Sequence, residues 1–288
     1  MSDVTGRGLA LVLERLARPY DPERVTAALL GLPNRVARQL VGAVLATSDE
    51  AEDLLEAMPA IVRSMAIATT DRAERCMGEL RGPVLWAETM SARSASAGDP
   101  GLFVCATTTK AYDTDENRVL KAALDAIRRA ARNAEHGMDS HADDVVRRAR
   151  HNGQHSAHLM EHQTLAQVPV VRPTGRALRR TRAGSRRHTY RPALALLRRA
   201  AEPMGADHLR AFADERTTGQ LDLLGTVVER VEQVTGAPLV LRSDRGAITG
   251  GPMTFHHPDR DDDAHPGHGI TVGGLLVTDP ASVSLALR

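Results

Sequence analysis

Aromatic side chains make up only 2% of this 288-residue chain, whereas 42% of its residues are hydrophobic. The core must therefore be built from leucine, valine and alanine, and small aliphatic cores favour packed helices. The length allows two domains or one large composite domain. Up to about Gly78 the apolar residues recur at helical spacing, as in the stripe of Leu9, Val12, Leu13 and Leu16.

Two of the helices expected before Gly78 lie close together in the sequence. One begins at Ser48 or Asp49 and runs to Met58, and the next carries Ile61 and Met65. This part of the chain contains no recognisable chemistry, so we expect it to be structural.

β-branched and aromatic residues mark the central part of the chain. They are concentrated in residues 83–93 and 102–112, and the intervening sequence SASAGDPG has turn chemistry. We expect these two segments to pair as a β-hairpin that leads directly into a helix at Asp113.

Helices and short strands are expected in the rest of the chain. The expected helices cover residues 141–167, a segment from Tyr190 or Arg191 onwards with Pro192 in its first turn, and residues 218–235 with Gly236 as the C-cap. The expected strands cover residues 238–242, 247–256 and 270–278. The prediction is a helix-rich α+β fold with an N-terminal helical region (1–78), a central region with a hairpin and long helices (79–204) and a small C-terminal α/β domain (205–288).

The stretch AYDTDENRVLKAALDAI, residues 111–127, places unusual polar chemistry at the start of a helix. Asp113 is expected to be the N-cap, and Glu116 completes a capping box. An apolar stripe that includes Leu120 and Leu124 then gives the helix one buried face. Asn117 and Arg118 are left unexplained, because Ala or Leu would make a better helix in the second turn.

The nine residues from Asp113 to Lys121 resemble the segment D-T-x-E-N-R-x-L-K of McrC-like proteins, which are partner subunits of motor-driven DNA restriction systems. The likeness extends to RGPVLWAETMSAR, VCATTTKAYDTDENR and RRHTYRPALALLRRA. It covers roughly residues 80–200 and, more weakly, 215–280. The resemblance implies that Asn117 and Arg118 lie where a β-layer meets a helical layer. There they would hydrogen-bond across a domain junction rather than bind a ligand. It also implies a motor ATPase or GTPase partner and a role in defence against foreign DNA.

McrC-like proteins end in a nuclease domain of the PD-(D/E)xK kind, in which a helix bearing an acid precedes strands that carry an Asp and an acid-x-Lys. This chain has the helix at 218–235 and strands after it, but Gly250, Gly251 and Pro252 stand where the Asp is expected. No lysine follows Lys121. The resemblance therefore implies a degenerate nuclease domain, and we expect no catalytic residue, metal or cofactor.

Two other readings stay open. One is a divergent metal-dependent DNA nuclease that uses Glu229, Asp244 and Asp279. The other is a protein–protein adaptor with no nucleic-acid role.

Histidines form two groups. His151, His155, His158 and His162 share one helical stripe, and two histidines four residues apart can bind Zn²⁺. No HExxH sequence and no carboxylate or cysteine pattern completes such a site, so an exposed polar face is expected. The second group, His256, His257, His265 and His268, lies in or beside a polar loop, where a designed metal site is not expected.

Arginines dominate residues 172–199, which contain ten arginines and no acid although the net charge of the chain is only +1. The segment is either a surface laced with ion pairs or a contact for a phosphate backbone. Tyr190 is its only aromatic residue, so base stacking is not supported. We expect non-specific DNA binding, and the candidate residues are Arg176, Arg179, Arg180, Arg182, Arg186, Arg187 and Arg191.

The two cysteines, Cys76 and Cys105, have no CxxC spacing and are expected to be reduced thiols. No apolar run approaches the ~20 residues of a membrane span, and the N-terminus lacks a signal-peptide core. We therefore expect a cytoplasmic protein with no membrane partner. The first reading of its function is a non-catalytic accessory or DNA-binding subunit of an McrC-like defence system.

Overall fold

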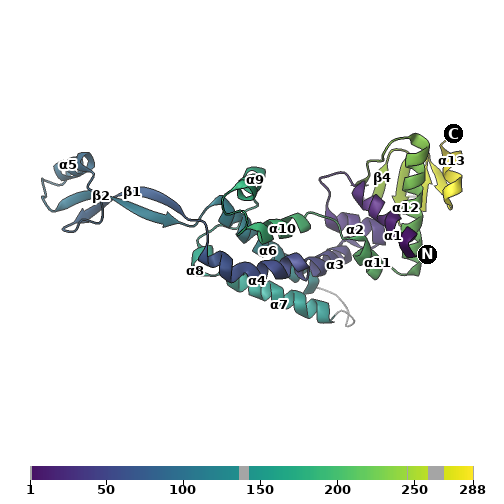
Figure 1. Cartoon of the computed structure of the whole chain (residues 1–288), viewed down its shortest axis with the longest axis horizontal. Coiled ribbons are helices and arrows are strands. Elements are labelled where there is room, and N and C mark those ends of the chain that lie inside the picture. Colours follow the sequence, from purple (N-terminus) through teal and green to yellow (C-terminus); the bar gives the residue numbers. More distant parts are fainter. Residues whose placement is uncertain (1, 136–142, 245, 259–268, 288) are drawn as a thin grey trace. The chain divides into compact units, whose positions relative to one another are not determined.

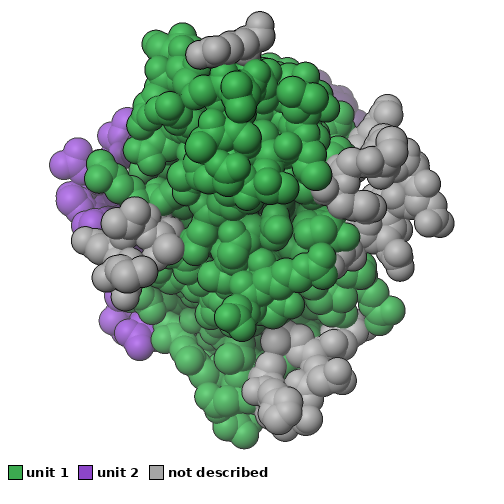
Figure 2. Space-filling view, turned by 90° about the vertical axis from the view of Figure 1, so that its right-hand side faces the viewer, with its two compact units in different colours: residues 1–55, 126–157, 195–288 green, residues 56–125, 158–194 purple. Residues whose placement is uncertain are grey.

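The computed structural model describes residues 2–135, 143–244, 246–258 and 269–287. Over these residues the chain is a helix-rich α+β fold with two antiparallel sheets, which confirms the expected class (Figure 1). It forms two compact units, coloured separately in Figure 2. Unit 1 comprises residues 1–55, 126–157 and 195–288, and unit 2 comprises residues 56–125 and 158–194. The expected domain boundaries after residues 78 and 204 do not coincide with these limits and stay predictions.

Unit 1 contains most of the helices and the larger sheet. Its helices, some of which continue into unit 2, are α1 (Ser2–Glu14), α2 (Pro22–Leu30), α3 (Asn34–Ala46), α4 (Asp49–Arg63), α6 (Asp115–Glu135), α7 (Asp143–Met160), α10 (Arg191–Arg199), α11 (Ala206–Phe212), α12 (Glu215–Thr235), the 3₁₀ turn η2 (Pro280–Ser282) and α13 (Val283–Ala286). Its strands are β3 (Arg242–Asp244), β4 (Ala247–Gly250), β5 (Met253–His256), β6 (Gly269–Val272) and β7 (Leu275–Val277).

The core of unit 1 joins the first helices to the last part of the chain. Leu9 and Val12 of α1 share one buried cluster with Leu224 and Val228 of α12 and with Phe255 of the sheet. The two helices approach closely because two glycines meet: a Cβ added to the glycine at position 225 would lie 2.4 Å from the carbonyl carbon of the glycine at position 8. The helix predicted at 218–235 is present as α12, and it ends as expected at a left-handed C-cap glycine whose N–H donates to the carbonyl of Glu232.

The larger sheet is an antiparallel meander in the order β3-β4-β5-β6-β7. The prediction of three strands is wrong, because the two longer candidates each fold back on themselves. Residues 247–256 form the β4–β5 hairpin around Gly251 and Pro252, and residues 270–278 form the β6–β7 hairpin around Gly273 and Gly274. Both glycines of the second turn have positive φ (59° and 83°), as two-residue hairpin turns require. The likeness to a nuclease domain stays a prediction.

Alanines line a second cluster of unit 1, where α3, α6 and α7 meet. Ala43, Ala46, Ala130, Ala131, Ala134 and Ala149 are its buried members. Glycine allows the same close approach here, since a Cβ on Gly153 would lie 2.4 Å from the Cβ of Ala131. The buried amide of Asn152 donates to the carbonyl of Ala46 at 2.9 Å. Small side chains thus take the place of the aromatic residues that the chain lacks.

A hydrogen-bonded ion pair fixes α1 to α12 and makes the stability of unit 1 depend on pH. Glu232 accepts from Arg15 Nε at 2.7 Å and from the backbone N–H of Leu239 at 2.8 Å. The hydrogen bond from Arg15 is the main reason that the pKa of Glu232 lies below its usual value. A carboxyl with a lowered pKa stabilises the fold above its unfolded pKa of about 4.3. That stabilisation is lost as the pH falls through the folded pKa.

We therefore expect Glu232→Gln to melt at a lower temperature than the wild type at pH 7, and this difference should shrink as the pH is lowered below about 5. Thermal melts in a series of buffers measure it. Glu229→Gln is the control, because Glu229 lies exposed on the same helix and makes no hydrogen bond or ion pair within the described residues. A difference for Glu232→Gln that stays constant from pH 7 to pH 3 would contradict this account.

Unit 2 is built around a long two-stranded antiparallel hairpin. Strand β1 (Ala68–Met77) pairs with β2 (Leu102–Ala111) along its whole length, from Ala68 opposite Ala111 to Met77 opposite Leu102. The expected strand at 102–112 is therefore present, but its predicted partner at 83–93 is wrong. Between β1 and β2 lies α5 (Trp86–Ala95), and α8 (Gln163–Ala166) and α9 (Gly175–Ala183) follow later in the chain.

Helix α5 replaces most of the expected strand because its residues, WAETMSARSA, are mainly good helix formers. Only the segment before it contacts β2 as a strand does: Ala106 N–H donates to the carbonyl of Pro83, and Leu85 N–H donates to that of Val104. The buried Thr89 hydroxyl accepts from Val104 N–H at 2.8 Å, which attaches α5 to the edge of β2. The guanidinium carbon (Cζ) of Arg93 lies over the ring of Phe103, 4.6 Å from the ring centroid.

Two predicted helix boundaries are also wrong. Helix α4 runs unbroken from Asp49 to Arg63 with Pro59 inside it, whereas the sequence suggested two helices. The single helix expected over residues 141–167 is divided into α7 and α8, and its first residues lie outside the described residues. The helix expected from residue 190 or 191 is present as α10, with Pro192 as its second residue.

Candidate functional site

The first turn of α6 holds the polar residues that the sequence singled out. Thr114, not Asp113, is the N-cap, because its Oγ1 accepts from Asn117 N–H at 3.3 Å. Asp113 instead accepts from Arg118 at 2.6 and 2.8 Å. This ion pair holds the pKa of Asp113 below its usual value. The Arg118 side chain is 40% exposed, so it lies at the surface beside a residue from its own segment.

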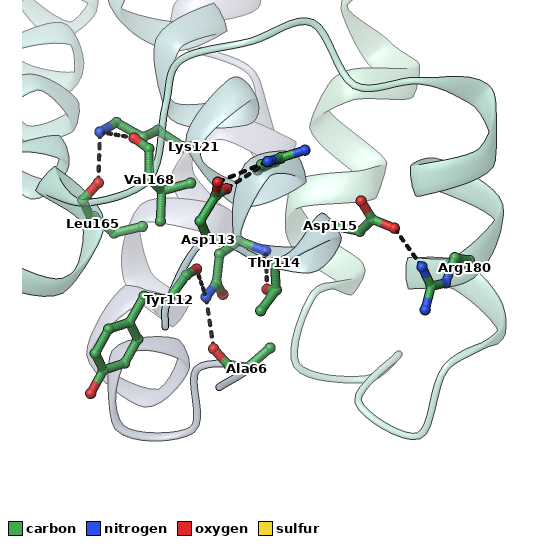
Figure 3. A network of polar contacts seen from close by, with 11 residues as sticks. Ala66, Tyr112, Asp113, Thr114, Asp115, Lys121, Leu165, Val168 and Arg180 are labelled. Atoms are coloured by element: carbon green, nitrogen blue, oxygen red, sulfur yellow. Dashed lines mark hydrogen bonds and ion pairs between the residues drawn. The ribbon is translucent and has the colours of Figure 1, made fainter. Parts of the chain in front are cut away.

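Asn117 is fully buried and uses both ends of its amide. Its Nδ2 donates to the carbonyls of Ala66, at 2.8 Å, and Tyr112, at 2.7 Å (dashed lines in Figure 3). Its Oδ1 accepts from the hydroxyl of Tyr190 at 2.5 Å. Ala66 lies just before β1 and Tyr112 just after β2, so one side chain binds both ends of the hairpin.

Tyr190 completes this network. It is fully buried, and its hydroxyl also accepts from the backbone N–H of Ala66 at 2.8 Å. Burial raises the pKa of the Tyr190 hydroxyl. Asn117 and Tyr190 together satisfy both backbone groups of Ala66, as buried polar groups require. We call Asn117, Tyr190 and the backbone of Ala66 and Tyr112 the hairpin clamp.

Lys121, one turn further along α6, is a second buried anchor that the sequence analysis did not assign. Its Nζ donates to the carbonyls of Leu165, at 2.6 Å, and Val168, at 2.5 Å (Figure 3). Desolvation by burial lowers the pKa of Lys121. The lysine thus ties the α8 turn to α6. Its position four residues after Asn117, on the same side of the helix, was the available signal.

Three of the candidate DNA-binding arginines make contacts within unit 2. Arg180 Nη1 donates to Asp115 at 3.0 Å (Figure 3), and Arg186 Nη1 donates to the carbonyl of Met65 at 3.3 Å. Arg187 contacts the ring of its neighbour His188. Arg186 and Tyr190 therefore attach the arginine-rich loop to the residues that enter the hairpin.

The other arginines of the segment are available to a partner. Within the described residues, no hydrogen bond or ion pair is made by the exposed side chains of Arg172, Arg176, Arg179, Arg182 and Arg191, which we call the unpaired arginines. Three of them belong to α9, where Ala177 and Thr181 face the interior and leave the other side of the helix basic. The aromatic ring of Tyr190 is buried and cannot stack on a base.

The three carboxylates of the divergent-nuclease reading are not brought together. Asp279 caps the 3₁₀ turn η2 by accepting from Ala281 and Ser282 N–H. Glu229 lies exposed on α12, and Asp244 ends β3. Over the ranges described, the structure contains no group of three or more His, Cys, Asp or Glu side chains placed to hold a metal ion.

His151 and His155 are exposed on α7 with ring centroids 6.4 Å apart. In the second group His257 is buried, while His265 and His268 lie outside the described residues.

The large exposed apolar residues of the α5 end of the hairpin are Met77, Leu80, Trp86 and Met90. None of the helices in the described part of the chain has both the length and the apolarity needed to cross a bilayer.

No protein-family model matches this chain, and no curated protein matches it.

Proposed function

We propose that this protein binds double-stranded DNA through the unpaired arginines, without cutting it. The observation that carries the proposal is the set of five exposed guanidinium groups within residues 172–191 that have no protein partner over the described ranges. Several exposed arginines elsewhere in this chain pair with acids, as Arg38 does with Glu23 and Arg150 does with Glu135. Guanidinium groups that lack such partners suit a polyanion.

The geometry favours backbone contact with a duplex over recognition of bases or single strands. Proteins that hold single strands combine basic grooves with aromatic platforms, and the one aromatic ring of this segment is committed to the hairpin clamp. Contacts from arginine to phosphate position a protein on DNA but carry no sequence information. Binding should therefore be non-specific and strongly dependent on salt.

In its wider role, we propose that the chain is a non-catalytic accessory subunit of an McrC-like restriction or defence system, with a motor ATPase or GTPase as partner. The support is the likeness of Asp113–Lys121 to the family segment, within which Asn117 belongs to the hairpin clamp and Lys121 binds the α8 turn. The dispersed positions of Glu229, Asp244 and Asp279 favour this role over a divergent nuclease.

The DNA-binding proposal predicts the effect of removing charge from α9. Replacing Arg176, Arg179 and Arg182 together with Gln should weaken binding of a labelled duplex about tenfold or more at low salt. Because three phosphate contacts are lost, the slope of log affinity against log salt should become shallower by about 2.7. Fluorescence anisotropy over a salt series measures both quantities.

The control changes the net charge equally at arginines that already pair with acids. Replacing Arg24, Arg38 and Arg150 with Gln should alter the slope little, since these side chains pair with Asp21, Glu23 and Glu135. Equal effects of the two triple variants, or no duplex binding by the wild type, would overturn the proposal and favour an adaptor. Nicking of the same duplex in Mg²⁺ that disappears in both Glu229→Ala and Asp279→Ala would establish a divergent nuclease.

A further inference from the structure

An acid of α6 lies against the basic face of α9. Asp115 is the first residue of α6, and its carboxylate accepts from Arg180 Nη1 at 3.0 Å (Figure 3). The Asp115 side chain is 28% exposed, whereas that of Arg180 is 65% exposed. Arg180 stands between the unpaired Arg179 and Arg182 in the sequence of α9. It is the one arginine of α9 that has an acidic partner within the described residues.

We infer that Asp115 is an internal competitor of DNA, which holds Arg180 against α6 and limits the affinity of the arginine surface. This inference rests on the proposed function and adds a regulating residue to that same site. A carboxylate and a phosphate oxygen accept the same hydrogen bonds from a guanidinium group. Arg180 can therefore turn fully to a phosphate only by leaving Asp115, or it must bind that phosphate beside a negative charge.

The position of Asp115 makes it an effective competitor. A carboxylate in the first turn of a helix is favoured by the positive end of the helix dipole, which helps to hold Asp115 in place. The pair is partly exposed and therefore modest in strength, so its removal should change the affinity severalfold. The expected result is a surface on which Arg180 stays with Asp115 when a duplex binds, so that Arg180 adds no phosphate contact in the wild type.

The test compares Asp115 with Asp113, an acid two residues earlier in the chain. Asp115→Asn should tighten binding of a labelled duplex about three- to fivefold at low salt, and it should steepen the salt slope by about 0.9 because one more arginine meets a phosphate. Asp113→Asn changes the net charge equally, but its partner Arg118 lies outside the arginine segment. It should change the affinity by much less.

Arg180→Gln, alone and combined with Asp115→Asn, completes a double-mutant cycle for this ion pair. In the wild type it should weaken binding only slightly, whereas in the Asp115→Asn background it should remove the whole gain in affinity. Thermal melts establish that each variant is folded, and Arg180→Gln tests the same contact from its other side if Asp115→Asn does not fold.

The outcomes separate this inference from the proposed function. If the wild type binds and Asp115→Asn gains no more than Asp113→Asn, the competitor role is wrong and DNA binding stands. If the wild type and both Asn variants fail to bind, the proposed function is wrong and the inference falls with it. Binding by Asp115→Asn that exceeds that of the wild type and depends on Arg180 supports both.

Discussion

Replacing Gly225 with alanine should destabilise unit 1 by about 3 kcal/mol or more, although it adds a single methyl group. Gly225 lies where α12 crosses α1, and an added Cβ would be 2.4 Å from the carbonyl carbon of Gly8 and 2.5 Å from its Cα. Backbone atoms cannot rotate away from this overlap as a side chain can. The two helices must separate, and the buried contacts of Leu9 and Val12 with α12 are weakened. Urea denaturation followed by circular dichroism measures the loss.

Glycine-to-alanine changes at Gly219 and Gly8 provide reference values for the stability loss at Gly225. Gly219 lies on the same helix with no atom within 4 Å of an added Cβ, so its replacement should stabilise the protein by about 0.5–1 kcal/mol through helix propensity. At Gly8 the nearest atom to an added Cβ is 3.1 Å away, and the loss should be smaller than at Gly225. A Gly225→Ala protein as stable as the wild type would show that α1 and α12 do not pack in this way.

Helix ends were predictable from the sequence where local chemistry decides them. Gly236 ends α12 because its left-handed conformation, with φ of 68°, suits glycine and lets its N–H bind the last turn. Pro192 marks the start of α10 because a helix has no partner for an N–H in its first turn. Helix-rich folding followed from the shortage of aromatic residues, and the alanine cluster shows the result.

Strand pairing was less predictable because distant contacts determine it. Strand β1 has the polar sequence ATTDRAERCM and is mostly exposed, so neither periodicity nor burial marks it; its pairing with β2 selects it. Residues 86–93 were expected to lie in a strand because of their Trp and Thr, but they belong to helix α5, since good helix formers make up most of Trp86–Ala95. The Gly273–Gly274 pair is a local hairpin signal, and counting it would have divided the last predicted strand correctly.

The sequence identified Asn117 as a polar residue that needs a structural explanation, but its hydrogen-bond partners could not be predicted. A polar residue in the second turn of a well-formed helix needs a buried partner, but Ala66 is 51 residues away in the chain and Tyr190 is 73. Arg118 looked equivalent because it is adjacent, yet one helical step turns it by about 100° to the surface. The excess of positive charge in the arginine segment is visible in the sequence. Only the fold shows that Arg180 and Arg186 have partners within the protein, whereas the unpaired arginines have none over the described ranges.

Asn117→Ala should be the most damaging single change in unit 2, with a loss of about 3 kcal/mol or more in the free energy of unfolding. The truncation leaves the carbonyls of Ala66 and Tyr112 and the hydroxyl of Tyr190 without their buried partner. Each unsatisfied buried group costs about 1–3 kcal/mol. Urea denaturation measures the total, and protease digestion should show earlier cleavage in the hairpin, whose two ends the amide holds.

The hairpin clamp also predicts that its members are coupled. Tyr190→Phe removes the hydroxyl that donates to Asn117 and accepts from Ala66 N–H, and it should cost about 1–3 kcal/mol. In the double variant the losses should be less than additive, since Asn117→Ala has already broken the bond between the two side chains. Arg118→Ala is the matched control: it truncates the next residue, whose ion pair is exposed, and should change stability little. Strictly additive losses, or an Arg118→Ala loss equal to that of Asn117→Ala, would mean that no buried network holds the base of the hairpin.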